Sequence, residues 1–261
     1  MSATKYVFSI REENVFLITI DHPPLNTLNL QTLSELESAL DEFAADSTLK
    51  VAILSGGDKP VFVTGVDLVE AGELLADGRH TDLIFRGQVL FPRIADCSKP
   101  IVAAINGLAL GGGMELAMAC HLRVMSDRAR LAQPEINLGV IPGWGGTQRL
   151  SRIVGPAKAT EMILTGERIS AQEALRLNLV NMVVPRREVL PASRALARKI
   201  AAKSGPVIRA AMDSIRMSTQ MSMTDGLAFE AGQIAKLINS ADAREGLMAF
   251  LEKRPPVFKD E

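Results

Sequence analysis

The sequence predicts an α/β protein followed by a helical C-terminal region, and three observations support this prediction. Short apolar and β-branched runs alternate with segments of helical periodicity through roughly the first two-thirds of the chain, which is typical of an α/β core. These strand signals end at Pro185, and only helical patterns follow. The chain has 261 residues, 47% of them hydrophobic and 23% charged, enough to bury a sizeable core. We therefore expect a core over residues 1–190 and a helical region over residues 191–261.

The first elements can be assigned one by one. Two β-branched and aromatic runs, 6–10 and 15–20, flank the charged turn 11–14 and predict a hairpin. The pair Pro23-Pro24 ends the second strand, because proline lacks the backbone donor and restricts its neighbour. Asn29 is a suitable N-cap for the helix that follows. One face of that helix is apolar, formed by Leu30, Leu33, Leu36, Leu40 and Phe43.

The remaining elements follow the same alternation and then change character. Further strands are expected at 51–54, 101–105 and 122–125, with a helix near 83–94 between the first two. Helices alone are expected near 187–203, 206–218, 223–238 and 241–252. These C-terminal helices carry more apolar residues than one small core would absorb: Ile208, Met212, Ile215, Leu227, Phe229, Ile234, Leu237 and Leu247. Because a large exposed apolar surface usually marks an interface, we expect a homo-oligomer.

Charge and cysteine content exclude several classes of function. The 29 basic and 30 acidic residues leave a net charge of −1, and basic patches are short and mixed with acids. We therefore expect neither a nucleic-acid nor an anionic-membrane partner. The only cysteines, Cys97 and Cys120, provide no disulfide framework and no metal-ligand spacing. The N-terminal sequence has no signal pattern. A cytoplasmic protein without a metal is expected.

The stretch from Ile101 to Cys120 contains a single charged residue, Glu115. It is long enough to cross a bilayer. The glycines at 107 and 111–113 would break a spanning helix, and a central carboxylate would be costly there. The stretch is therefore interpreted as a buried strand, a glycine turn and a buried helix, with Glu115 in an apolar setting.

The glycine cluster 111–113 stands where a helix is expected to begin. Neither a G-x-G-x-x-G nor a G-x-x-x-x-G-K-[ST] pattern is present, so a nucleotide-phosphate loop is not indicated. Free N–H groups at such a helix start can instead stabilise a developing oxyanion. Glu115 lies in the first turn, among apolar neighbours. A buried glutamate without an evident partner usually has a function, so it is preferred here over simple dipole compensation.

A second carboxylate, Glu135, is the only charge in an irregular loop over 131–146 that contains two prolines and four glycines. Taken alone, it could equally be a solvent-exposed loop acid. Beside Glu115 it would gain a role, because two carboxylates facing one cavity have pKa values that are pushed apart. One could then donate a proton while the other accepts one.

Together, the segments carrying these residues resemble the enoyl-CoA hydratase/isomerase (crotonase) family. The resemblance runs through the chain and is strongest over 104–155, where Asn-Gly-x-Ala-x-Gly-Gly-Gly-x-Glu-Leu-Ala is followed by Gln-Pro-Glu-x-x-Leu-Gly-x-Ile-Pro-Gly-x-Gly-Gly-Thr-Gln-Arg-Leu. It implies a crotonase-type spiral of ββα turns, with the C-terminal helices mediating trimers, often paired into hexamers. It also implies hydration of a 2-enoyl-CoA thioester in the degradation of fatty acids or related acyl-CoAs.

The resemblance assigns roles by motif position. Glu115 and Glu135 match the catalytic glutamates of hydratases, with Glu115 as the base and Glu135 as the acid. The N–H groups of Val66 and Gly112 would form the oxyanion hole. Binding of the acyl-CoA substrate would involve Val66, Asp67, Leu68, Val69, Gly112 and Trp144. No cofactor is implied, because coenzyme A is part of the substrate.

Two features leave the acyl specificity open. Val66 is bulkier than the alanine common in hydratases, and Trp144, the only tryptophan, could either wall the acyl pocket or simply pack in the core. Another crotonase-type reaction, such as enoyl-CoA isomerisation or hydrolysis of a cyclic acyl-CoA, is the nearest alternative. A non-catalytic acyl-CoA-binding or RNA-binding protein of the same fold is a more distant one.

Overall fold

The computed structural model describes residues 4–261 and begins with the predicted hairpin. Strands β1 (Val7–Glu12) and β2 (Val15–Ile20) pair antiparallel, and helix α1 (Leu30–Ala45) follows. The side chain of Asn29 accepts the N–H of Thr32 at 2.7 Å, which confirms the predicted N-cap.

The chain then repeats a unit that consists of two strands followed by one or more helices. The first unit comprises β3 (Val51–Ser55), β4 (Val61–Val63), α2 (Leu68–Ala76) and α3 (His80–Ala95). The second comprises β5 (Ile101–Ile105), β6 (Leu108–Leu110) and α4 (Gly112–Ala119). The third comprises β7 (Leu122–Ser126), β8 (Arg130–Ala132), the 3-10 helix η1 (Glu135–Leu138), α5 (Gly146–Val154) and α6 (Pro156–Thr165).

The two strands of each unit join different sheets. The first strands lie side by side in a six-stranded sheet of order β1-β2-β3-β5-β7-β10, and the second strands in a four-stranded sheet of order β4-β6-β8-β9. β3, β5 and β7 pair in parallel, as do β4, β6 and β8. Each turn of the chain therefore adds one parallel strand to both sheets, which is a spiral of ββα turns.

The last part of the core closes both sheets. It comprises β9 (Ile169–Ser170), α7 (Ala171–Arg176), β10 (Met182–Val184), the 3-10 helix η2 (Arg186–Glu188) and α8 (Val189–Ala201). Apolar residues of α8, such as Val189 and Ala197, form a core cluster with one face of the large sheet. The main cluster includes buried residues of α1, α3 and α4. The predicted division after residue 190 falls inside α8, which packs with the sheet.

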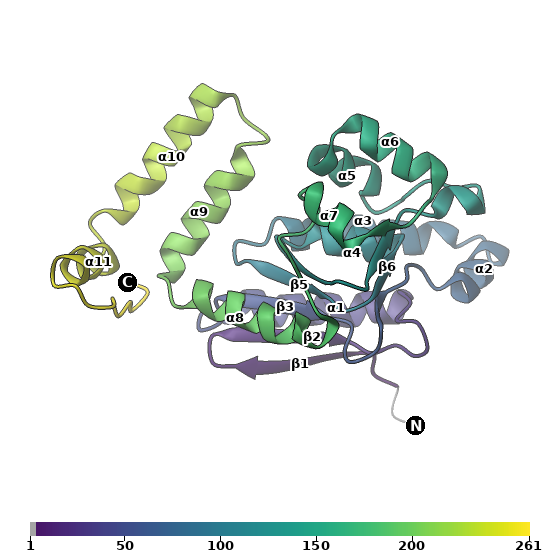
Figure 1. Cartoon of the computed structure of the whole chain (residues 1–261), viewed down its shortest axis with the longest axis horizontal. Helices are drawn as coiled ribbons and strands as arrows, with labels where there is room; N and C mark the ends of the chain where they lie inside the picture. The colour runs from purple at the N-terminus through teal and green to yellow at the C-terminus, as the bar shows by residue number, and fades with distance from the viewer. Residues whose placement is uncertain (1–3) are drawn as a thin grey trace.

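The remaining helices, α9 (Gly205–Met217), α10 (Met223–Leu237) and α11 (Ala241–Leu251), extend away from the core (Figure 1). No residue of α10 is buried. The end of the chain returns to the core, where the Asp260 carboxylate pairs with Lys50 Nζ at 2.8 Å. Within residues 4–261, no helix is both long and apolar enough to cross a membrane.

Candidate active site

Helix α4 carries Glu115 in its first turn, and all eight of its residues are buried. The Glu115 side chain is only 2% exposed. The expectation of a carboxylate in an apolar setting is therefore confirmed. Burial removes the water that would solvate this charge, so Glu115 depends on nearby protein donors.

The start of α4 depends on glycines for two different reasons. Gly111, the residue before the helix, has a φ of 52°, a left-handed conformation that other residues adopt with strain. Gly113 is needed for close packing, since a β-carbon there would lie 1.9 Å from the carbonyl oxygen of Val63 in β4. These two positions let the helix begin directly against the small sheet.

The N–H groups of Val66 and Gly112 belong to two loops that meet. Gly65 turns the chain with a φ of 99°, and a β-carbon on it would lie 3.5 Å from the nitrogen of Gly112. Neither the Val66 N–H nor the Gly112 N–H donates a hydrogen bond to any group in residues 4–261. The structure thus brings together the two loops whose N–H groups the family resemblance assigns to an oxyanion hole.

Two backbone donors hold the Glu115 carboxylate. Its Oε1 atom accepts the N–H of Trp144 at 2.8 Å and the N–H of Gly146 at 2.7 Å. Burial raises the pKa of Glu115, while these two hydrogen bonds and the positive charge of Arg149 oppose that rise. Because the donors stabilise the charged form, they favour an ionised carboxylate at a buried position.

Glu135 begins η1 and lies against the turn before α4. A β-carbon on Gly111 would lie 2.9 Å from Oε1 of Glu135. Burial raises the pKa of Glu135 to about 7, and the negative charge of Glu115 adds to the rise. The two carboxylates therefore share one site, and one of them is near half-protonated at neutral pH.

Gln133 contacts Glu135 and lies near Gly146, a donor to Glu115, and this position was not predicted from the sequence. Its side chain is fully buried. With the amide nitrogen turned toward Glu135, that nitrogen lies 3.1 and 3.2 Å from the two carboxyl oxygens. The same end of the amide would lie 2.9 Å from a β-carbon on Gly146, whose N–H donates to Glu115. The only feature of the sequence that could have pointed to Gln133 as a site residue is its position two residues before Glu135.

Trp144 is buried, with 4% of its surface exposed, although it lies in the glycine-rich loop. Its carbonyl oxygen accepts a hydrogen bond from Arg149 Nη1 at 2.7 Å, and its own N–H donates to Glu115. Arg149, the second residue missed from the sequence, thus supports the loop that holds the Glu115 carboxylate. The Trp144 ring also packs edge-on against Phe91 of α3, with centroids 5.2 Å apart.

The segment after Val66 forms the start of α2. The Asp67 carboxylate caps this helix by accepting the N–H groups of Val69 and Glu70, and it also accepts the hydroxyl of Thr27 at 2.8 Å. Leu68 and Val69 are 62% and 74% exposed. An open apolar surface therefore lies next to the Val66 N–H.

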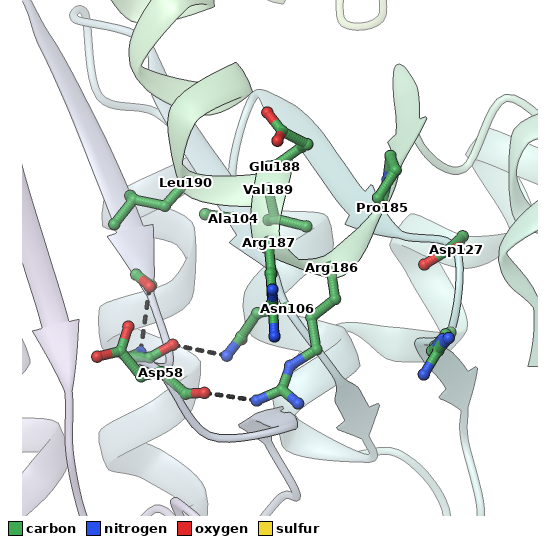
Figure 2. Close-up of a pocket in the computed structure, with 13 residues that line it drawn as sticks. Asp58, Ala104, Asn106, Asp127, Pro185, Arg186, Arg187, Glu188, Val189 and Leu190 are labelled. Atoms are coloured by element: carbon green, nitrogen blue, oxygen red, sulfur yellow. Dashed lines mark hydrogen bonds between the residues drawn. The ribbon is translucent and has the colours of Figure 1, made fainter.

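A separate cavity of about 810 Å³ lies where β3, β5, β7 and β10 end, beside the start of α8 (Figure 2). Its charged lining is mixed, from Asp58, Asp127, Arg128, Arg186, Arg187 and Glu188. Neither Glu115 nor Glu135 lines it, and Arg186 is partly occupied by donating to the carbonyl of Asp58. The carboxylate pair therefore defines a different site.

Comparison with known proteins agrees with this arrangement. Residues 10–261 match the family described as enoyl-CoA hydratase/isomerase. The chain belongs to this family. A probable enoyl-CoA hydratase of Bacillus subtilis is 43% identical over 251 residues, covering 96% of this chain and 97% of the relative. The short-chain-enoyl-CoA hydratase of Clostridium acetobutylicum is 39% identical, with 94% of both chains covered.

Solved structures of the enoyl-CoA hydratase/isomerase family share the fold. An enoyl-CoA hydratase from Bacillus anthracis superimposes with a TM-score of 0.95 at 35% identity, covering 98% of this chain and all of the other. The human enoyl-CoA hydratase domain-containing protein 3 gives a TM-score of 0.91 at 32% identity. The predicted crotonase-type spiral with a helical C-terminal region is therefore confirmed.

Proposed function

We propose that this protein is an enoyl-CoA hydratase that adds water across the 2,3-double bond of a 2-enoyl-CoA thioester. The observation that carries the proposal is the pairing of Glu115, whose carboxylate accepts two backbone N–H groups, with Glu135, whose pKa is raised to about 7. Hydration needs one group to deprotonate water and another to deliver a proton to carbon. The family and the names of the relatives support the same reaction.

The proposed reaction begins with polarisation of the thioester carbonyl by the N–H groups of Val66 and Gly112. Glu115 removes a proton from a water whose oxygen bonds to Cβ, and the π electrons move to form an enolate. Protonated Glu135 then gives its proton to Cα as the enolate collapses. One oxyanion donor typically contributes about 10²–10³ in rate, and a positioned acid or base about 10²–10⁴.

Two features of the Glu115 carboxylate fit the role of base. Both backbone donors bind Oε1, and Oε2 accepts no hydrogen bond from residues 4–261. This leaves one oxygen to receive the proton of a water.

Leu68 and Val69 supply exposed apolar surface beside Val66, which suits the pantetheine arm of coenzyme A. Asp67 orders this segment by capping α2.

A homo-oligomer, a trimer or hexamer, is part of the proposal. Exposed apolar residues recur at intervals of four or seven along α10 and its C-cap and so share one face: Met223, Leu227 and Ile234 of the helix and Ile238 at the cap. A row of this kind is usually covered by another chain. A cytoplasmic location, the absence of a metal or cofactor and the absence of a nucleic-acid partner stay predictions.

The decisive experiment is an assay of the purified protein against a panel of 2-enoyl-CoA thioesters. Hydration removes the double bond conjugated to the thioester, so absorbance falls and 3-hydroxyacyl-CoA forms. Conversion of a 3-enoyl-CoA without uptake of water would identify an isomerase instead. Release of free coenzyme A, or cleavage of a cyclic acyl-CoA, would identify a hydrolase.

A further inference from the structure

The Trp144 indole occupies the space beside the proposed oxyanion donor Gly112. A β-carbon on Gly112 would lie 2.7 Å from Cζ3 and 2.9 Å from Cε3 of the ring. The benzene half of the indole therefore touches the residue whose N–H would hold the thioester oxygen. Because the reacting carbons must lie within a few ångströms of that oxygen, the indole borders the acyl group itself.

Helix α3 fixes the other side of the ring. Gly87 lies in the interior of α3, and a β-carbon there would lie 2.3 Å from Cε2 and Nε1 of the indole. Phe91, one turn further along, meets the ring edge-on. Glycine weakens a helix interior, so its presence here needs a packing reason. The indole fills the volume that any other residue at position 87 would occupy.

The backbone around Trp144 is anchored at three points. Its N–H donates to Glu115 Oε1 at 2.8 Å, and its carbonyl accepts from Arg149 at 2.7 Å. The carbonyl of Gly143 accepts from Gln88 Nε2, on α3, at 3.0 Å. These contacts fix the backbone from which the indole projects, and Gly87, Gly112 and Phe91 enclose the ring itself.

We infer that Trp144, backed by Gly87, forms the end wall of the acyl pocket and restricts this enzyme to short acyl groups. The inference rests on the proposed hydration. The acyl carbons beyond Cβ of the substrate, if they extend toward α3, would meet the packed indole ring after a few carbons. In an apolar pocket, one methylene changes discrimination by about 10–200-fold. We therefore expect kcat/KM to fall with each methylene added beyond the indole.

The first test compares kcat/KM for trans-2-enoyl-CoA substrates of four, six, eight and ten carbons. The parent is expected to prefer the four-carbon substrate. Trp144→Ala should raise the ratio of eight-carbon to four-carbon kcat/KM by at least about tenfold, and Trp144→Phe should fall between the two. Phe43→Leu is the control, because it also reduces a buried aromatic, but in the core beside Phe16. It should leave the ratio unchanged.

The second test uses Gly87 in two backgrounds. Gly87→Ala places a methyl group into the indole and should lower kcat/KM for the four-carbon substrate in the parent. In the Trp144→Ala background the same change has no indole to displace and should cost little. Such non-additivity is the signature of direct contact. If Gly87→Ala acted only by changing the stability of helix α3, its effect on kcat/KM would be the same in both backgrounds.

The outcomes separate this inference from the proposed function. An unchanged chain-length ratio in folded Trp144→Ala, or a parent that hydrates eight- and four-carbon substrates equally, overturns the inference while leaving hydration intact. If the parent hydrates no enoyl-CoA, the proposed function fails. Calorimetric binding of saturated acyl-CoA thioesters then tests whether Trp144 limits the length of the bound acyl chain. Tighter binding of butyryl-CoA than octanoyl-CoA, reversed by Trp144→Ala, supports it; equal binding in both proteins rejects it.

Discussion

At the scale of single residues, the two glutamates differ in what surrounds their carboxyl groups. Glu115 is more deeply buried but receives two backbone N–H donors, whereas Glu135 faces the negative charge of its partner. This difference in environment is the basis for proposing Glu115 as the base and Glu135 as the acid, although their side chains are chemically identical. The resemblance to hydratases supplied the same assignment from motif position, and the roles stay predictions until variants are measured.

Replacing Glu135 with glutamine should preserve folding and thioester binding but abolish most hydration. Glutamine keeps the shape and a hydrogen bond to Gln133 but cannot give a proton to Cα, so we expect kcat to fall by about 10²–10⁴. The measurements are turnover on the four-carbon enoyl-CoA and circular dichroism. A natively folded variant with turnover within a few-fold of the parent would contradict the assignment of the acid.

The raised pKa of Glu135 also predicts how activity and stability change with pH. The proposed acid must be protonated, so kcat/KM should decline as pH rises through about 7. Since the pKa in the folded protein lies above its value in the unfolded chain, the folded state binds the extra proton between about 4.5 and 7. This contribution to stability is fully present at pH 4.5 and is lost as pH rises through 7.

Comparison of thermal denaturation at pH 5 and pH 8 measures this linkage. Glu135→Gln has no proton to lose at this position. The decrease in Tm from pH 5 to pH 8 should therefore be smaller in Glu135→Gln than in the parent. Equal decreases in the two proteins would show that Glu135 does not titrate abnormally in the folded state.

Substitutions at Val66 test whether its N–H belongs to the proposed oxyanion hole, because the N–H and the side chain can be changed separately. Val66→Ala keeps the N–H and should retain activity on small substrates. Val66→Pro removes the N–H and should lower kcat by about 10²–10³ on every substrate. Near-normal turnover in folded Val66→Pro would remove this residue from the oxyanion hole.

At the scale of elements, the position of α4 depends on its close contact with β4. Gly113→Ala would bring a methyl group within 1.9 Å of a backbone carbonyl, which cannot move without displacing the strand. We expect overpacking to cost about 1–3 kcal/mol or more and to lower Tm by several degrees. The matched control is Gly143→Ala, where no atom lies within 4 Å of the added carbon. Equal Tm changes in the two variants would show that the close contact between Gly113 and β4 does not determine stability.

The long strands, α1, α3, α4 and the C-terminal helices were predicted well from the sequence, whereas α2, α5, α6 and α7 were not among the predicted elements. Expected segments such as 15–20 and 101–105 have the observed bounds, and each C-terminal helix lies within a few residues of its prediction. The small sheet was not predicted, because β6 and β8 have three residues each and β9 has two. Runs this short carry no detectable periodicity. Their pairing depends on partners from neighbouring turns of the spiral.

At the scale of the whole molecule, α9, α10 and α11 make little contact with the core of their own chain (Figure 1). Such an arm is stable only if its apolar face is covered, which is why an assembly is proposed. Light scattering at micromolar concentration should therefore give the mass of a trimer or hexamer. A stable monomer would overturn this proposal.

A double substitution on α10 locates the interface more sharply. Leu227→Glu combined with Ile234→Glu places two charges on the exposed apolar face and should dissociate the assembly while each chain stays folded. The control, Lys236→Glu, introduces the same side chain on the opposite side of the helix. If the double variant keeps the parent mass, the α10 face is not the interface.

The sequence by itself determined the alternation of strands and helices, the helical C-terminal region and the presence of a lone carboxylate in an apolar stretch. Those features are local, since periodicity, glycine turns and caps lie within a few residues of one another. The tertiary structure alone decided that Glu135 lies near Glu115, that Gln133 contacts Glu135, and that Trp144 is wedged between Gly87 and Gly112. These contacts join residues from different turns of the spiral. Their distances and pKa shifts depend on packing that no local pattern encodes.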